Sequence, residues 1–288
     1  MPELNKDQLV RWQAVLEAQT GINLKQHEHI LVKGLGPWLQ DLGEAEAELT
    51  LARSESQPWR GLGAWLVDHL AVKETRFYRN PAAYRVLAQY LSRRLKTGEG
   101  RLTLDLWSAG CSSGEEAYTM AMIASEMIEH AERRAYFGVI GSDISSAAVK
   151  AARQGVFHVR RLQSLPDTLR QRYLLGDGLA YRIEPKLASR VCFVQSNLLD
   201  AGCTPTSAMD VIFCQNVLVY FRGWRQKQVL NNLVKRLKPG GILVIGASEG
   251  RGWRHPDLTR LPGESVQGFE RRQDGREAAA PANETRAQ

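Results

Sequence analysis

The segment Trp107-Ser-Ala-Gly-Cys-Ser-Ser-Gly-Glu-Glu116 decides the fold of this chain. It follows a short apolar run, residues 102–107, and precedes a stretch from about Glu115 whose apolar side chains recur at helical spacing. A strand, a tight turn of small residues and a helix are therefore predicted. Small residues let the backbone approach a ligand, and a helix start offers unpaired N–H groups. The turn lacks the dinucleotide-binding glycine pattern and the lysine of a P-loop, which disfavours a phosphate-bearing ligand.

Strands and helices alternate after this turn. Strands are expected at residues 135–140, 191–194, 211–214 and 242–245, and helices at 147–154 and 225–237. Pro239-Gly240-Gly241 is expected to stop the last helix. Strands of buried type that alternate with helices indicate a parallel sheet covered on both faces.

Other regions depart from this alternation. Residues 1–80 show helical spacing without strand-like runs, so a small helical domain is expected before a sheet domain over residues 81–274. The polar, basic stretch at 157–190 interrupts the sheet domain, and its segments 173–178 and 180–183 suit a small hairpin. Residues 275–288 have no apolar pattern and are expected to be a disordered tail or a linker.

The composition is that of an ordinary globular protein, with 43% hydrophobic and 24% charged residues among 288. No apolar run approaches the roughly 20 residues that cross a bilayer, and the N-terminus lacks the pattern of a signal peptide. A cytoplasmic protein without direct membrane insertion is therefore expected.

The cysteines and histidines do not indicate a metal site. Cys111, Cys192, Cys203 and Cys214 are widely spaced, and we expect buried, reduced thiols. His27 and His29 stand together in a polar stretch with no cysteine nearby, so we expect no metal there.

The net charge of +7 is concentrated in the middle of the chain. Residues 150–190 hold nine Lys or Arg and three Asp or Glu, a balance of +6, whereas residues 1–80 have a balance of −2. The basic segment is either a solvated surface or a docking patch for an acidic protein or a nucleic acid. Composition alone leaves these readings open.

Polar residues follow four successive predicted strands, at the edge where ligands bind open α/β sheets. They are Glu115, Asp143, the pair Asn197-Leu198 and the pair Cys214-Gln215. Each has an ordinary structural explanation, since acids favour helix starts, Asp is a good N-cap and amides tie down loops. Together they indicate an adenosine with a positively charged tail and no phosphate. S-adenosylmethionine fits this description.

Several motifs, in this order, resemble the bacterial chemoreceptor glutamate methyltransferases, the CheR family. They are Glu74-Thr-Arg-Phe-Tyr-Arg79, the segment 107–116, Gly141-Ser-Asp143, Asn197-Leu-Leu199, Ile212-Phe-Cys-Gln-Asn-Val-Leu-Val-Tyr-Phe221, Leu237-Lys-Pro-Gly-Gly241 and Gly246-Ala-Ser-Glu249. The resemblance implies an N-terminal helical domain and a class I methyltransferase fold, a Rossmann-like doubly wound sheet with a small inserted β-subdomain. It also implies methyl transfer from S-adenosylmethionine to receptor glutamates, which gives methyl esters and S-adenosylhomocysteine.

The resemblance further implies roles for individual residues. Cofactor contacts carry over to Lys73, Thr75, Arg79, Glu115, Asp143, Asn197, Leu198, Cys214 and Gln215. Arg79 and Tyr220 carry over as residues near the reacting groups. A glutamate carboxylate is already a nucleophile at neutral pH, so the site must mainly align the reactants and exclude water.

The chain departs from the family pattern at three places. Lys73 stands where asparagine is common and Gln215 where arginine is common, which puts both contacts in doubt. Leu175-Gly-Asp-Gly-Leu179 replaces a longer glycine-rich loop that accompanies docking to a pentapeptide at receptor tails. We therefore expect an enzyme that does not depend on a pentapeptide.

Two rival functions remain open. Methylation of another substrate such as RNA is compatible with the basic segment, although no Lys/Arg-rich run with interleaved aromatics is present. A cofactor-sensing module without catalysis is the second, and the presence of both Arg79 and Tyr220 argues against it. Chemoreceptor cytoplasmic domains, and not nucleic acid, are the expected partners.

Overall fold

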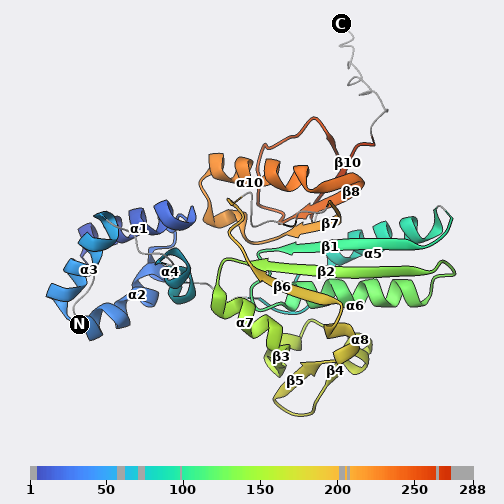
Figure 1. The fold of residues 1–288 in the computed structure, drawn as a ribbon, viewed down its shortest axis with the longest axis horizontal. Helices are drawn as coiled ribbons and strands as arrows, with labels where there is room; N and C mark the ends of the chain where they lie inside the picture. Colours follow the sequence, from blue (N-terminus) through green and yellow to red (C-terminus); the bar gives the residue numbers. More distant parts are fainter. Residues whose placement is uncertain are drawn as a thin grey trace, which may run out of the picture.

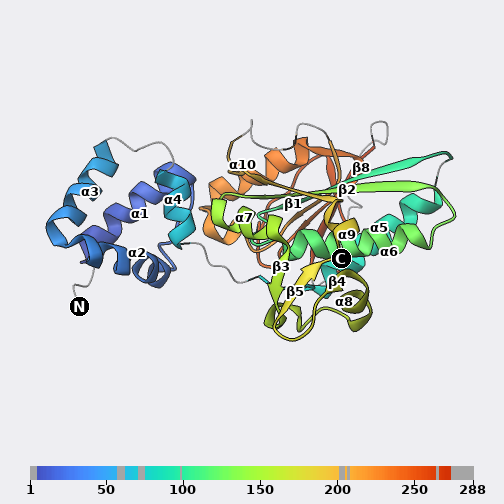
Figure 2. The same ribbon diagram turned by 60° about the horizontal axis from the view of Figure 1, so that its bottom comes forward.

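The computed structural model describes residues 5–56, 62–70, 75–97, 99–200, 205, 208–263 and 266–273. Lys73, Cys203 and the predicted tail at 275–288 lie outside these residues. Figures 1 and 2 show a layer of helices at one end and a sheet with flanking helices beside it. No helix in the described part of the chain combines the length and apolar character that a membrane span requires.

The N-terminal layer contains helices α1 (Lys6–Thr20), α2 (Glu28–Leu42), α3 (Glu44–Ser56) and α4 (Leu62–Leu70). Helix α1 begins in a capping box, in which Asn5 and Gln8 satisfy each other's backbone N–H groups, and it ends at Gly21 in the left-handed region. Trp12, Leu16 and Leu35 are almost fully buried in a core that these helices share. This apolar core explains why the region is helical throughout.

The central sheet has the order β6-β2-β1-β7-β8-β10-β9 among the described residues. Its strands are β6 (Val191–Gln195), β2 (Ala135–Asp143), β1 (Leu102–Ala109), β7 (Met209–Cys214), β8 (Leu237–Ile245), β10 (Gln267–Arg271) and β9 (Leu258–Arg260). The first five are parallel, and β10 and β9 add antiparallel pairs. The strand order reverses between β1 and β7, which makes this a doubly wound sheet.

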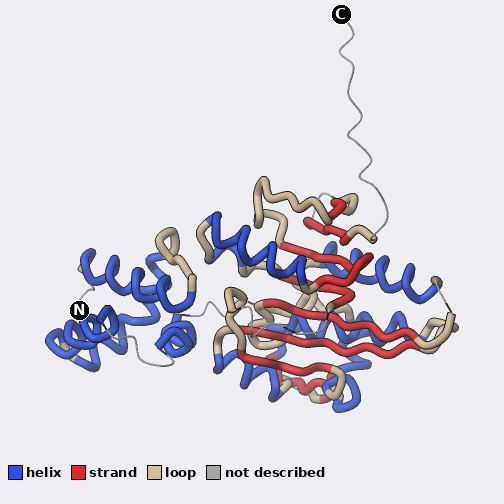
Figure 3. Tube along the Cα trace, turned by 45° about the horizontal axis from the view of Figure 1, so that its top comes forward, coloured by secondary structure: helices blue, strands red, loops and turns tan. Residues whose placement is uncertain are grey.

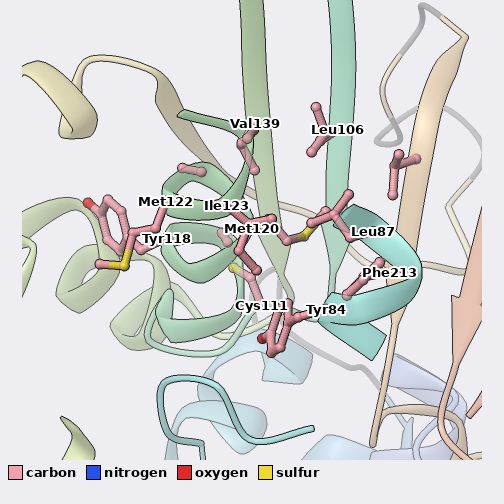
Figure 4. Packing of buried hydrophobic residues seen from close by; sticks show 14 of the residues in the cluster. Tyr84, Leu87, Leu106, Cys111, Tyr118, Met120, Met122, Ile123, Val139 and Phe213 are labelled. Carbon is pink, nitrogen blue, oxygen red and sulfur yellow. The ribbon is translucent and has the colours of Figure 1, made fainter. Parts of the chain in front are cut away.

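Helices cover the sheet on both faces, as the sequence predicts. Helices α5 (Pro81–Lys96), α6 (Glu115–Glu129) and α7 (Ser146–Gln154) lie on one face, and α10 (Gly223–Lys235) packs against β7 and β8 on the other (Figures 1 and 3). Side chains alternate between the two cores along each strand. Leu106 and Phe213 join the α5–α6 core together with Met120 (Figure 4), whereas Trp107 and Ile212 face α10.

A small subdomain follows α7. It consists of β3 (Val156–His158), the short 3₁₀ helix η1 (Val159–Leu162), α8 (Asp167–Tyr173), β4 (Leu174–Leu175), β5 (Ala180–Ile183) and α9 (Pro185–Ala188). The predicted hairpin is present as the antiparallel pair of β4 and β5, and β3 pairs on the other side of β5.

Two sequence predictions are wrong. Pro239-Gly240-Gly241 does not stop a helix, because α10 has already ended at Lys235 and these residues lie inside β8, beside a shift of register against β7. Cys192 is exposed rather than buried, because it lies on the edge strand β6. Cys111 and Cys214 are buried free thiols, as expected.

Asp210 ties four elements together at the end of the sheet opposite the carboxyl ends of the parallel strands. Its carboxylate is fully buried and accepts hydrogen bonds from Arg94 (3.0 Å), Lys238 (2.6 Å) and the backbone N–H of Asp105 (2.9 Å). These groups belong to α5, β8 and β1, and Asp210 itself belongs to β7. One buried acid with two cations thus fixes these four elements relative to one another.

Replacing Asp210 by alanine should destabilise the fold, because Arg94 loses the charge that compensates its partial burial and Lys238 keeps only Asp105, at 2.8 Å. Breaking a buried ion pair costs about 3–5 kcal/mol, and we expect about 3 kcal/mol because Arg94 and Lys238 each remain about one-third exposed. The free energy of unfolding in urea measures this loss. The matched variant Asp167→Ala, at a mostly exposed acid, should change it by less than about 0.5 kcal/mol.

Candidate functional site

A cavity of about 280 Å³ opens at the carboxyl ends of the parallel strands. Loops that follow β1, β2, β6 and β7 line it, together with residues 75–80 and the helical layer. This is the place where the strand order reverses, and ligands bind α/β sheets there. The cavity brings together seven of the residues that the sequence selects: Thr75, Arg79, Asp143, Asn197, Leu198, Gln215 and Tyr220.

The turn after β1 has room for nothing larger than glycine at its first position. Gly110 has φ of 84°, in the left-handed region, and a Cβ there would lie 2.3 Å from Cγ2 of Val217. Ser112, two residues on, also has a positive φ, of 50°. Strained backbone of this kind persists where the surroundings hold it, often at binding sites.

Asp143 holds this turn against the loop after β2. One carboxylate oxygen accepts the N–H of Ser112 at 2.8 Å, and the other accepts the N–H of Ser145 at 2.9 Å. Ser145, and not Asp143, is the N-cap of α7. Burial raises the pKa of Asp143, while the two backbone N–H groups lower it. Each oxygen retains a further lone pair with which to accept a ligand hydroxyl.

Glu116 faces the cavity within a network of polar side chains. Its oxygens accept hydrogen bonds from the Ser108 hydroxyl (2.7 Å) and from the Gln215 amide (2.9 Å), and Gln215 in turn accepts from Asn80 (2.9 Å). Burial raises the pKa of Glu116 to about 7, although Ser108, Gln215 and Arg79 lower it. The sequence analysis missed Glu116.

Glu115 does not line the cavity. Its side chain is buried on the other side of the helix start, where it accepts a hydrogen bond from Ser113 at 2.8 Å and lies 3.8 Å from Arg161. Adjacent residues on a helix point about 100° apart, so the two acids leave the helix in different directions. Of these two acids, Glu116 faces the cavity.

The loops after β6 and β7 flank those after β2 and β1 and line the cavity as well. Asn197 and Leu198 line the cavity, and the Asn197 amide also donates to the carbonyl of Thr20 in α1 (3.2 Å). Cys214 is fully buried in β7 and does not line it, whereas the next residue, Gln215, does. The predicted contact by Cys214 therefore has no support from its side chain.

Glu249 is a second acid that the sequence analysis did not assign to the site. It is buried and accepts backbone N–H bonds from Asn216 (2.9 Å), Leu218 (2.7 Å) and Gly246 (2.9 Å). These bonds fix the loop that follows β7 and leads into the 3₁₀ helix η2, Leu218–Tyr220. Glu249 thereby positions the loop that carries Tyr220.

Residues 75–80 add two more of the predicted side chains. Thr75 and Arg79 both line the cavity, and the carbonyl of Thr75 accepts a hydrogen bond from Arg161 of η1. The N–H of Phe77 donates to the Arg161 carbonyl at 3.0 Å. The inserted subdomain thus holds the segment that presents Arg79.

The helical layer closes the cavity from the other side. Leu16, Ile22, Val67 and Leu70 line it with apolar side chains. The backbone N–H of Asn23 donates to the carbonyl of Tyr220 at 2.7 Å, which joins this layer to the loop after β7. The sequence analysis did not predict that helices α1 and α4 contribute to the site.

The donors and acceptors of the cavity suit S-adenosylmethionine. Asp143 offers acceptors for a diol, Glu116 offers a carboxylate for an ammonium group, and Ile144 and Leu198 offer apolar surface for a ring. Gly110 leaves space for close approach to the backbone.

Residues 73–261 match the sequence profile described as "CheR methyltransferase, SAM binding domain". The chain belongs to the CheR methyltransferase family. It is therefore a class I methyltransferase with S-adenosylmethionine as its cofactor. Motifs that resemble the family lie in the loops after β1, β2, β6 and β7, and residues of these loops line the cavity.

Relatives match most of the chain in sequence. A chemotaxis protein methyltransferase of Escherichia coli K12 is 32% identical over 237 residues, 80% of each chain. One of Borreliella burgdorferi is 29% identical over 254 residues, 85% of this chain and 89% of that protein. The crystal structure of magnesium protoporphyrin IX methyltransferase from Synechocystis, with bound S-adenosylmethionine, covers 83% of this chain at 14% identity and a TM-score of 0.38, which adds nothing to the assignment.

Replacing Glu116 by glutamine should change how stability depends on pH. The pKa of Glu116 is raised from 4.5 to about 7, so between these values the folded state binds a proton that the unfolded state has lost. Glu116 therefore destabilises the wild type progressively as pH rises from about 5 through 7, and glutamine removes this loss. Urea unfolding at pH 5.5, 7 and 8.5 should show the variant gaining stability relative to wild type with pH. The exposed control Glu132→Gln should show no such trend, and an equal trend in both would contradict the prediction.

Proposed function

We propose that this methyltransferase moves the methyl group of S-adenosylmethionine to glutamate side chains of chemoreceptor cytoplasmic domains. The products are glutamate methyl esters and S-adenosylhomocysteine, and the reaction serves adaptation in a chemosensory pathway. The observation that carries the proposal is that Arg79 and Tyr220 line the same cavity as Asp143 and Glu116. The names of the relatives, chemotaxis protein methyltransferases, support the same substrate class.

The chemistry asks little of the protein beyond alignment. When bound, S-adenosylmethionine supplies an electrophilic methyl group, and the sulfur keeps the electron pair of the broken carbon–sulfur bond. A substrate carboxylate forms the new oxygen–carbon bond without a general base, since it is ionised at neutral pH. Alignment of this kind contributes about 7–11 kcal/mol when it is near ideal. The apolar side chains of the helical layer, such as Leu16 and Val67, help to exclude water.

Arg79 and Tyr220 are proposed to act on the reacting groups. The Arg79 guanidinium can hold a carboxylate through two parallel hydrogen bonds, either that of the substrate or that of the cofactor. Tyr220 offers a directional hydroxyl, on a loop that Glu249 and Asn23 fix through the backbone. Asp143, Asn197, Leu198, Thr75 and Gln215 are proposed as cofactor contacts, with Glu116 in the role that the sequence suggests for Glu115.

The proposal extends to organisation and partners. We place the boundary of the helical domain near residue 80, with the methyltransferase domain over 81–274 and the inserted subdomain over 157–190. The partner is the surface of a receptor cytoplasmic domain and not a nucleic acid. The enzyme acts in the cytoplasm. The loop between β4 and β5 is short, with Gly176 and Gly178 at positive φ, which supports recognition that does not use a pentapeptide.

A methylation assay against a panel of the host's receptor cytoplasmic domains tests the function. Base-labile methyl groups on receptor glutamates are the expected product. Transfer to RNA but not to receptors would favour the rival substrate, and tight cofactor binding without transfer to any substrate would favour a sensing module.

Conservative changes at the two proposed catalytic residues should separate alignment from binding. We expect Arg79→Lys and Tyr220→Phe to lower kcat by about 10–100-fold, because small misplacements of reacting groups cost factors of this order. Affinity for S-adenosylhomocysteine should fall less than tenfold in Tyr220→Phe. Initial rates with an unmethylated receptor domain and calorimetry provide the two readouts. Arg85→Lys, at an exposed position on α5, is the control and should behave as wild type.

The short loop predicts the outcome of a peptide-binding experiment. Titration of a receptor C-terminal pentapeptide into the protein should give no heat of binding, because the loop between β4 and β5 lacks the length of the glycine-rich loop that accompanies such docking. Calorimetry that showed micromolar affinity would contradict the proposed independence. Receptor domains with and without the pentapeptide should be methylated at the same rate.

A further inference from the structure

A carboxylate of the helical layer binds the start of helix α7, beside the cavity. Asp68 of α4 accepts hydrogen bonds from the hydroxyls of Ser145 and Ser146, both at 2.5 Å, and from the N–H of Ala147 at 3.2 Å. All three donors belong to the start of α7. The same helix contributes Val67 and Leu70 to the cavity wall, so Asp68 lies at the seam between the two layers.

The turn that Asp68 holds is the one that aims Asp143. Ser145 is fully buried, and its backbone N–H donates to Asp143 at 2.9 Å. Its hydroxyl oxygen also accepts the N–H of Ala148 at 3.0 Å while it donates to Asp68. These two bonds hold the Ser145 side chain in one rotamer, and they hold the residue in the place where its N–H donates to Asp143.

Capping of α7 alone does not account for Asp68. Ser145 already caps the helix from within the same chain segment, and α7 has only nine residues. Asp68 also places a second carboxylate near Asp143, whose pKa is raised first by burial and further by this charge. Two like charges so close are unfavourable, so the arrangement is explained better by a requirement for fixed geometry than by capping.

Two other contacts bind the helical layer to loops of the same cavity. The Asn197 amide donates to the Thr20 carbonyl, and the Asn23 N–H donates to the Tyr220 carbonyl. Asp68 differs from these contacts because its side chain acts on Asp143 through a single intermediate residue, Ser145. A side-chain change at Asp68 can thus be tested without altering the backbone.

We propose that Asp68 is a positioning residue for the cofactor site, which sets Asp143 through Ser145 and makes part of the cofactor affinity depend on the helical layer. This inference rests on the proposed role of Asp143 as a cofactor contact. Asp68 touches neither the cavity's ligand space nor the reacting atoms, so its effect is on affinity and not on the chemical step.

The test is calorimetric titration of S-adenosylhomocysteine into variants of the full chain. Asp68→Ala should weaken binding about tenfold, as expected for one lost charge-assisted hydrogen bond at a preorganised site. Asp68→Asn should restore most of the affinity, because its amide oxygen still accepts from Ser145 and Ala147 while its NH₂ group donates to Ser146. With saturating cofactor, kcat of Asp68→Ala should stay within about twofold of wild type, so that the change falls on KM.

Controls separate positioning from loss of stability. Glu48→Ala breaks the ion pair with Arg11 inside the helical layer and should lower stability without changing affinity. Hydrogen exchange at the Ala147 amide should be faster in Asp68→Ala, which reports the lost contact without any cofactor. If Asp68→Ala does not fold, Ser145→Ala tests the same link, because Asp68 keeps its bonds to Ser146 and Ala147.

Asp143→Asn distinguishes the two ways in which the idea can fail. If this variant loses affinity and Asp68→Ala binds as wild type, the positioning role is wrong while the cofactor site stands. If neither variant loses affinity, the assignment of Asp143 is wrong and the inference about Asp68 is wrong with it. A loss in Asp68→Ala that asparagine does not restore would also overturn the proposed route through Ser145.

Discussion

The two backbone hydrogen bonds to the Asp143 carboxylate are the constraint on which the cavity depends. They join the turn after β1, in which Ser112 has a positive φ, to the turn after β2. Ser112 and Asn216, both at positive φ, line the space that results. Two buried carboxylates, Asp143 and Glu249, therefore fix the loops around the cavity by accepting hydrogen bonds from backbone N–H groups.

Much of the fold follows from the sequence because its strands are short and apolar on both faces. The parallel strands and the helices beside them are where their periodicity places them. Helix α5 was not expected, although Pro81 at its first position and the spacing of Tyr84, Leu87 and Leu91 indicate it. The antiparallel strands β9 and β10 were also not expected. Strand β9 has only three residues, and both strands follow the part of the chain in which strands and helices alternate.

Most residues that the sequence selects line the cavity, but Glu115 and Cys214 do not, and the reason is geometric. Periodicity locates a helix start but not the rotation of its first turn, so Glu115 and Glu116 were indistinguishable before the packing was known. Cys214 and Gln215 raise the same question on a strand, where neighbours face opposite sides. The contribution of α1 and α4 depends on how two layers meet, about which local sequence carries no information.

The cavity is assembled from residues as far apart as Leu16 and Phe221. Contacts of such long sequence separation form late in folding, because the chain between them must be ordered first. The cofactor therefore has nothing to bind until the parallel sheet and the helical layer have met, and it selects the finished structure over every partly folded one. Free cofactor consequently raises the free energy of unfolding of this enzyme, because it binds only the folded state. When the cofactor is depleted, the enzyme loses its methyl donor and also becomes easier to unfold and degrade.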